Sequence, residues 1–377
     1  MLQSVLISVV FALGGARAKA IVPELTGPYK VGTTVLELID ASRQDPFAPT
    51  PQPRDLIISL FYPTQTRNCT LAPQFPPITA AAIDSRINGT GVAESVFTRA
   101  CDGSPLSRPD LPLLFFGPGL GTSRLFHSDT AAEFASRGWN VVTIDHPYDG
   151  MIVEYPDGRF VLPTDSPTQA DTTPAQYLDA RVKDLSFVLD SLSDPAVTSR
   201  IPGLDGRHSR GTARGKLRTD KIGVFGHSLG GATALQLLAE DARFAAGADL
   251  DGAVFGPVVQ AGTDAPFVYV RRPGHTHESD PTWAEAWPNL TGFKREYIVD
   301  GTTHGSFTDL PILRDLLGAE TLGEYADEVG TIEGARIVEI ETALLGALFD
   351  RYIKGHGGEL LDGQGLDAYP EITLATN

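Results

Sequence analysis

A six-residue turn, Gly226-His227-Ser228-Leu229-Gly230-Gly231, constrains the fold of this chain more than any other stretch. It lies between a short apolar strand and an apolar helix, and it matches the pattern G-x-S-x-G, in which a sharp strand-to-helix turn lifts a serine hydroxyl above a sheet. Ser228 would be strained there, and glycines at 226 and 230 would relieve the crowding of its neighbours. The pentapeptide alone arises by chance in roughly one chain in five, but its strand and helix make it specific.

Apolar segments alternate between strand-like runs and helical periods along the chain, which is typical of an α/β sheet with crossover helices. We therefore expect an α/β-hydrolase fold: a mostly parallel eight-stranded sheet with helices on both faces, in one domain over residues 21–377. The segment 63–110 should decorate the sheet rather than extend it. The expected strands are 35–39, 56–62, 113–116, 141–145, 222–225, 246–250, 267–270 and 296–299, and the expected helices are 128–137, 174–191, 231–241 and 335–354.

Residues 1–20 have the pattern of a secretory signal peptide, because an apolar run is followed by the small-residue site Ala18-Lys19-Ala20. The apolar run is too short to span a bilayer, and no later segment reaches the roughly 18 apolar residues that a membrane helix needs. We expect a soluble, secreted, extracellular protein.

The cysteines and sequons fit an exported chain. Cys69 and Cys101 are the only cysteines, and in an oxidising compartment such a pair most simply forms one disulfide; two buried free thiols are the alternative. Sequons at Asn68, Asn88 and Asn289 would place glycans on surface loops. Asn68 is the weakest of the three because Cys69 is its middle residue.

The acidic charge excludes classes of partner. Removal of Arg17 and Lys19 with the signal would leave 28 basic and 47 acidic residues, a net charge of −19. Such a surface repels polyanions, so we expect neither nucleic acid nor an anionic membrane as a docking partner. One loop, residues 200–221, carries seven Lys or Arg. Because it precedes a strand, it should lie away from the carboxyl ends of the sheet, as a solvated loop.

A serine hydroxyl becomes nucleophilic only beside a histidine that a carboxylate orients, and the expected chain order is Ser, acid, His. His304 follows the last predicted strand in a loop of small residues, so we predict it as the base. For the acid we prefer Asp251, which precedes a glycine at a strand end, over Asp249, which should alternate to another face. The other histidines after the serine fit less well, because they follow the preceding strand or lie beyond the last helix: His275, His277 and His356.

Acyl transfer also needs two backbone N–H groups for the oxyanion. The residue after the serine, Leu229, supplies one. The glycine-rich loop 117–121 follows a predicted strand, and we expect Leu120 in it to supply the other.

Together these residues resemble the plasma-type platelet-activating-factor acetylhydrolases, particularly the versions that fungi secrete. The resemblance implies a calcium-independent serine esterase without a cofactor, which removes short or oxidised sn-2 acyl groups from glycerophospholipids and contacts a lipid interface transiently at most. It implies Ser228 as nucleophile, Asp251 as acid, His304 as base, and Leu120 and Leu229 as oxyanion donors. The chain departs from the family pattern at Pro118, where family members often have a histidine. The motifs that carry the resemblance are "TGPYKVG" (26–32), "SRQDPF" (42–47), "GLGTSR" (119–124), "IDHPYDG" (144–150), "GHSLGG" (226–231), "LDGAVFGP" (250–257) and "THGSFTDLP" (303–311).

Alternatives remain. The same triad would serve a general carboxylesterase or a cutinase-like polyester hydrolase, and some α/β-hydrolase folds are inert binding modules, although those usually lack a triad member. His146 and Asp149 in "DHPYDG" should shape the pocket wall or tie down a loop.

A zinc site is a further alternative, because His275, His277, Glu278 and Asp280 lie close in the sequence. However, Asp280 followed by a proline predicts the N-cap of a helix, which would leave both histidines in an exposed loop. We expect no metal.

Overall fold

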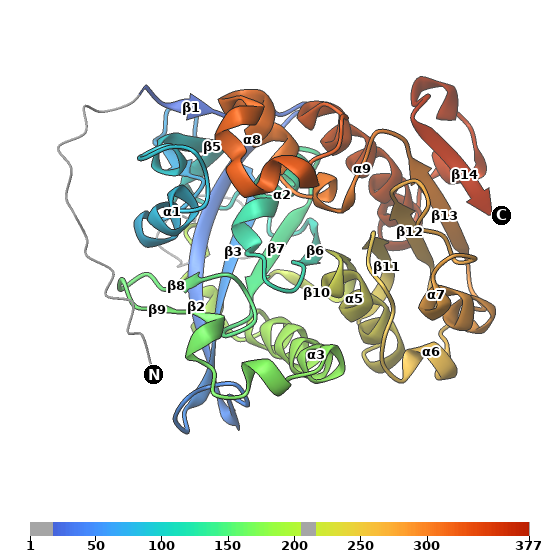
Figure 1. Ribbon diagram of the computed structural model, residues 1–377, viewed down its shortest axis with the longest axis horizontal. Helices are drawn as coiled ribbons and strands as arrows, with labels where there is room; N and C mark the ends of the chain where they lie inside the picture. Colours follow the sequence, from blue (N-terminus) through green and yellow to red (C-terminus); the bar gives the residue numbers. More distant parts are fainter. Residues whose placement is uncertain (1–17, 205–215, 377) are drawn as a thin grey trace.

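The computed structural model describes residues 18–204 and 216–376, which form a mixed, mostly parallel sheet with helices packed against it (Figure 1). Most of the predicted signal peptide (residues 1–17) and part of the basic loop (residues 205–215) lie outside the described residues, as does residue 377. No helix within the described ranges combines the length and the apolar character needed to cross a bilayer.

Twelve strands form the main sheet of the described chain, in the spatial order β1-β5-β2-β3-β7-β6-β10-β11-β12-β13-β14, with β4 paired to β5. All eight predicted strands are present. The bounds are β1 Ala20–Ile21, β2 Lys30–Gln44, β3 Pro53–Thr64, β4 Leu71–Pro73, β5 Val96–Asp102, β6 Pro112–Gly117, β7 Asn140–Asp145, β10 Arg218–His227, β11 Phe244–Leu250, β12 Phe267–Arg271, β13 Lys294–Val299 and β14 Ile372–Thr376. A separate hairpin joins β8 Val153–Glu154 to β9 Phe160–Val161.

Helices cover both faces of the sheet, as the sequence predicts. One apolar cluster joins α3 and α5 to the sheet, and another joins α2 and α9 to the opposite face. The four predicted helices are present, and the α-helices of the described chain are α1 Pro77–Asp84, α2 Ser128–Ser136, α3 Pro174–Ser191, α4 Pro195–Thr198, α5 Leu229–Glu240, α6 Val258–Ala261, α7 Pro281–Ala286, α8 Leu310–Leu317 and α9 Gly334–Phe349.

The central strands are apolar on both sides because each side meets a helical layer. In β10, Ile222 and Val224 belong to the cluster with α3 and α5, whereas Phe225 points into the cluster with α2 and α9. These three side chains are at most 1% exposed. The strand that leads into Ser228 is therefore fixed from both faces.

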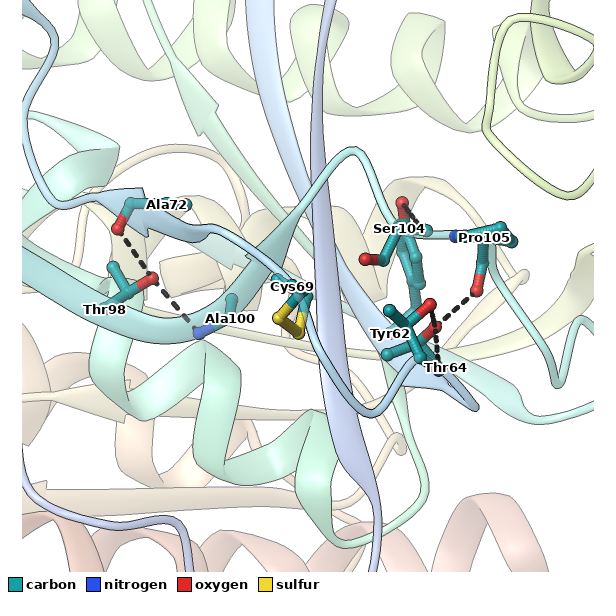
Figure 2. Close-up of a disulfide and its surroundings, with 10 residues drawn as sticks. Tyr62, Thr64, Cys69, Ala72, Thr98, Ala100, Ser104 and Pro105 are labelled. Carbon is teal, nitrogen blue, oxygen red and sulfur yellow. Dashed lines mark hydrogen bonds between the residues drawn. A yellow bond between two sulfur atoms is a disulfide. The ribbon is translucent and has the colours of Figure 1, made fainter.

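The segment 63–110 departs from the prediction, because it extends the sheet. β5 pairs in parallel with β2 at Gly32 and Thr33, and β1 pairs with β5 in turn. A disulfide joins Cys69 to Cys101 across 32 residues and ties the loop before β4 to the end of β5 (Figure 2). The strand character of β5 comes from this pairing rather than from an apolar run, so the hydrophobic pattern did not reveal it.

The chain reverses its direction across the sheet between β6 and β10. β6 connects to β7 on one side, whereas β10 leads to β11, β12 and β13 on the other. β6 and β10 are themselves parallel neighbours, with Gly226 opposite Gly117. In an open α/β sheet, connections that leave adjacent strands in opposite directions open a crevice at their carboxyl ends, and ligands bind there.

Candidate active site

Ser228 occupies the sharp turn between β10, which ends at His227, and α5, which begins at Leu229. Its backbone has φ 55° and ψ −124°, a conformation that a residue with a Cβ rarely adopts. The flanking glycines are required. A Cβ on Gly226 would come within 2.2 Å of the carbonyl carbon of Gly230, and a Cβ on Gly230 within 2.0 Å of the carbonyl oxygen of Gly117.

The two aspartates at the end of β11 have different environments. Asp249 is fully buried, its Oδ1 accepts a hydrogen bond of 2.8 Å from the N–H of Gly252, and a Cβ on Gly231 would lie 1.9 Å from that oxygen. Burial raises the pKa of Asp249 well above its ordinary value. Asp249 packs against Gly231 of the serine turn and binds the backbone of Gly252.

Asp251 faces His304 instead. His304 Nδ1 lies 2.7 Å from Asp251 Oδ2, and His304 stands in the loop after β13 with its side chain 43% exposed. Asp251 is buried and has a positive φ of 57° at the end of β11. Burial raises the pKa of Asp251, but hydrogen bonds from His275 and His304 outweigh burial and hold the pKa well below its ordinary value. A charged carboxylate therefore faces the His304 ring.

His227 links this pair to the serine turn. The Nε2 of His227 lies 3.0 Å from the carbonyl oxygen of His304, and the two rings are 4.5 Å apart between centroids. Burial lowers the pKa of His227 to about 3, so the neutral ring donates this hydrogen bond. Among the described residues, the Ser228 hydroxyl forms no hydrogen bond with His304. Such bonds are often long in unliganded enzymes and tighten with substrate.

The loop 117–121 lies directly against the serine. A Cβ on Gly119 would be 3.2 Å from the Cβ of Ser228. Within the described parts of the chain, no hydrogen bond uses the backbone N–H of Leu120 or of Leu229. Unpaired backbone donors in the loop beside the serine and in the residue after the serine can stabilise an oxyanion that forms there.

Arg181 of α3 fixes the shape of this loop. Its guanidinium donates to the carbonyl oxygens of Pro118 at 2.5 Å and Gly119 at 3.1 Å, and it pairs with both carboxylate oxygens of Asp149. The backbone oxygen of Asp149 accepts from the N–H of Gly121 at 3.0 Å. Asp149 ties down a loop, as its motif predicts, whereas no motif points to Arg181.

The remaining histidines after Ser228 differ in exposure and in their contacts. His356 is exposed beyond α9. His275 and His277, which we expected in an exposed loop, have side chains only 11% and 19% exposed, so that expectation is wrong. Each ring stacks on a tryptophan and bonds a buried carboxylate: His275 bonds Asp251, and His277 bonds Glu296. Because their Nδ1 atoms face different carboxylates, the two rings do not converge on one ion.

Asp280 is the N-cap predicted for α7, because its side chain accepts from the N–H of Thr282 at 2.8 Å. The three sequons differ in environment. Asn68 and Asn88 are exposed, and the amide nitrogen of Asn88 donates to the carbonyl oxygen of Glu320 at 2.8 Å. The amide nitrogen of Asn289 donates to the carbonyl oxygens of Val259 and Glu285.

Comparison with known proteins identifies the family. The model of the family described as platelet-activating factor acetylhydrolase, isoform II, matches residues 14–157 and 168–346. The chain belongs to this family. It is 28% identical to a probable 1-alkyl-2-acetylglycerophosphocholine esterase of Arthroderma benhamiae, over 94% of this chain and 93% of that protein. It is 23% identical to the platelet-activating factor acetylhydrolase of Cavia porcellus, over 94% of this chain and 84% of that protein.

Among solved structures, a ferulic acid esterase from Streptomyces cinnamoneus superposes with a TM-score of 0.79 and 31% identity, over 95% of this chain and 100% of that chain. This member of the platelet-activating factor acetylhydrolase family therefore has the α/β-hydrolase fold and is a carboxylic-ester hydrolase.

Proposed function

We propose that this enzyme hydrolyses the sn-2 ester of glycerophospholipids that carry a short or oxidised acyl chain, with Ser228 as nucleophile, His304 as base and Asp251 as acid. The observation that carries the proposal is the 2.7 Å contact between His304 and the buried, charged Asp251, beside the strained turn of Ser228. A strained serine between a glycine-rich loop and a helix N-terminus is the arrangement that acyl transfer requires.

The reaction proceeds through an acyl-enzyme. Ser228 Oγ attacks the ester carbonyl carbon while His304 takes the hydroxyl proton, and Asp251 stabilises the imidazolium that forms. The tetrahedral intermediate collapses, the bond to the glycerol oxygen breaks, and His304 gives the proton to the leaving alcohol. A water molecule then attacks the acyl carbon and passes a proton to His304. The second tetrahedral intermediate collapses, the bond from the acyl carbon to Ser228 Oγ breaks, and His304 returns the proton to Oγ as the carboxylic acid leaves.

The oxyanion of each tetrahedral intermediate would accept from the N–H groups of Leu120 and Leu229. Both donors are unpaired within the described chain, and Arg181 holds the carbonyl groups before Leu120. Removal of one such donor typically costs about 3 kcal/mol of transition-state stabilisation. The positive end of α5, which begins at Leu229, adds to this stabilisation.

The substrate class rests on the relatives. The protein of Arthroderma benhamiae, aligned over nearly the whole chain, is described as an esterase of 1-alkyl-2-acetylglycerophosphocholine. The second candidate function is a general carboxylesterase, which the likeness to a ferulic acid esterase favours, because that protein matches at 31% identity. The two candidates share the chemistry and differ in the leaving alcohol and the acyl group.

We also infer that the protein is exported, with residues 1–20 as a signal peptide and glycans on the exposed Asn68 and Asn88. Removal of that peptide would take Ala20 from strand β1 and leave Ile21 as the residue that pairs with β5. The disulfide between Cys69 and Cys101 supports an oxidising compartment. For the glycan sites, Asn289 is the least suited of the three because its amide nitrogen is committed to two backbone carbonyls.

A panel of esters tests the substrate. We expect kcat/KM for 1-alkyl-2-acetylglycerophosphocholine to exceed that for the analogue with a long sn-2 chain by at least about 100-fold. In a pocket that fits only a short acyl chain, each methylene too many can weaken transition-state binding by about tenfold, and a long chain adds many. Methyl ferulate, p-nitrophenyl acetate and a polyester film complete the panel, and Ser228→Ala is the control. Preference for methyl ferulate or polyester would contradict the phospholipid assignment and support a general carboxylesterase.

A further inference from the structure

Asp251 has a second imidazole partner besides His304. The Nδ1 of His275 lies 2.7 Å from Asp251 Oδ1, while His304 occupies Oδ2 at the same distance. The opposite nitrogen of His275, Nε2, lies 2.7 Å from Oδ2 of Asp280. The ring stacks on Trp283, with centroids 4.5 Å apart, and is 11% exposed. The imidazole of His275 is thus held between two carboxyl groups.

This geometry fixes the charge of His275. A neutral imidazole has one N–H, so two carboxylates at hydrogen-bond distance from both nitrogens require the doubly protonated ring. Burial raises the pKa of Asp280, but hydrogen bonds from Thr282 and His275 hold it below its ordinary value, and hydrogen bonds from His275 and His304 do the same for Asp251. Burial lowers the pKa of His275, yet the two carboxylates raise it above its ordinary value. Both acids are ionised near neutrality, so His275 is an imidazolium.

We propose that His275 is a positioning residue of the esterase, whose imidazolium clamps Asp251 opposite His304 and so holds the carboxylate in line with the His304 ring. The inference rests on the proposed function and deepens it. The acid of a serine triad orients the base and stabilises the imidazolium that forms on it during the reaction. A charge-assisted hydrogen bond to Oδ1 fixes the plane of the carboxylate, so that Oδ2 stays directed at His304 Nδ1.

Two arginines also lie near Asp251. Arg272 donates to Oδ2, the oxygen that His304 contacts, but its side chain is 41% exposed, so solvent screens its charge more than that of His275. Arg271 is buried, and its charge is paired with that of Glu296. Burial raises the pKa of Asp249 and of Tyr269. The titratable and charged groups that face the bridge are Asp249, Asp251, Tyr269, Arg271, Arg272, Asp280, His227 and His304.

Two substitutions separate charge from contact. His275→Asn removes the imidazolium together with its contact to Asp280. Asp280→Asn leaves the Oδ1 that caps Thr282 and puts an N–H group opposite His275 Nε2, so the ring becomes neutral while its Nδ1–H still bonds Asp251. His277→Asn is the matched control, because His277 also stacks on a tryptophan and bonds a buried carboxylate, but that carboxylate is Glu296 rather than Asp251.

The measurement is kcat/KM for p-nitrophenyl acetate between pH 4 and 9. We expect the pH profile of His275→Asn to change in shape and its alkaline plateau to fall up to about tenfold, whereas the plateau of Asp280→Asn stays within about threefold. The profile of His277→Asn should overlay that of the wild type. A wild-type profile and plateau in His275→Asn, or an equal change in His277→Asn, overturns the inference.

A second measurement does not depend on catalysis. In ¹⁵N-labelled protein at pH 7, the two ring nitrogens of His275 should both have protonated chemical shifts, and in Asp280→Asn one of them should become unprotonated. A single protonated nitrogen in the wild type overturns the inference. Failure of the proposed function is distinguishable, because the wild type would then not hydrolyse the ester, or Ser228→Ala would retain the activity.

Discussion

At the scale of single residues, backbone strain is concentrated around the site. Among the described residues, three that are not glycine have a positive φ: Tyr148, Ser228 and Asp251. Tyr148 precedes Asp149, which pairs with Arg181 behind the oxyanion loop. Each such residue costs about 1–3 kcal/mol, and a fold retains that cost only where its surroundings impose it. The strained residues therefore lie at the edge of the sheet where His304 contacts Asp251.

Arg181→Lys should lower kcat about 100-fold while KM changes by less than about threefold. A lysine side chain cannot bond the carbonyl groups of Pro118 and Gly119 and the carboxylate of Asp149 at the same time. The loop would then no longer hold the N–H of Leu120 in position for the oxyanion. Because the oxyanion forms only after substrate is bound, the loss should fall on kcat. Steady-state kinetics with p-nitrophenyl acetate measures both constants.

The control for this prediction is Arg54→Lys. Arg54 is as buried as Arg181 and pairs with Asp45 and Asp184, but it does not bond the oxyanion loop. Both variants should lower the melting temperature, and only Arg181→Lys should lower kcat. An equal loss of kcat in the two variants would mean that general destabilisation, rather than the loop, controls the rate.

At the scale of secondary-structure elements, helices α2, α8 and α9 each contribute a buried acidic side chain to the same region. Asp129 of α2, Asp309 at the start of α8 and Glu341 of α9 are all at most 4% exposed. Thr130 donates to Glu341, and Gln74 donates to Asp309. Burial raises the pKa of Glu341 to about 8 and that of Asp309 to about 7. These groups are neutral in the folded protein at mildly acidic pH.

The acids make stability depend on pH. The pKa of Glu341 is higher in the folded than in the unfolded chain, so its contribution to stability is fully present below about pH 4.5 and is lost as the pH rises to about 8. Glu341→Gln removes this titration and keeps an acceptor for Thr130. At pH 7 we expect the variant to gain on the order of 3 kcal/mol in the free energy of unfolding.

Denaturant unfolding between pH 5 and pH 8.5 checks this expectation. The advantage of Glu341→Gln should grow as the pH rises. Glu339→Gln on the same helix is the control, because the Glu339 side chain is 45% exposed, and it should follow the wild type. Parallel curves for Glu341→Gln and the wild type would show that Glu341 is charged in the folded protein.

At the scale of the whole molecule, the sequence predicts the long apolar strands well because they are buried on both faces. It misses β1, β4, β5 and β14, which are held by their neighbours rather than by their own pattern. β14, for example, follows a glycine-rich tail and pairs antiparallel with β13. The chain reversal between β6 and β10, which opens the crevice for the site, follows from the order of these strands and not from any single segment.

The site divides in the same way. Ser228, Asp251 and His304 each follow a strand of the predicted sheet, so the strand ends together with the expected chain order pointed to them, and His304 contacts Asp251 in the structure. Arg181 and His275 could not be predicted, because one lies within a regular helix and the other beside a helix cap. Their roles depend on residues 32 and 24 positions away, Asp149 and Asp251.

The most direct test of the account is covalent modification of Ser228. A fluorophosphonate reacts with a serine only where a base activates it and an oxyanion hole receives the phosphoryl oxygen. Peptide mass spectrometry should find one adduct per chain, on Ser228, formed in step with the loss of ester hydrolysis and absent from Ser228→Ala. Hydrolysis that continues with Ser228 fully modified, or an adduct on another residue that tracks inactivation, would contradict the account.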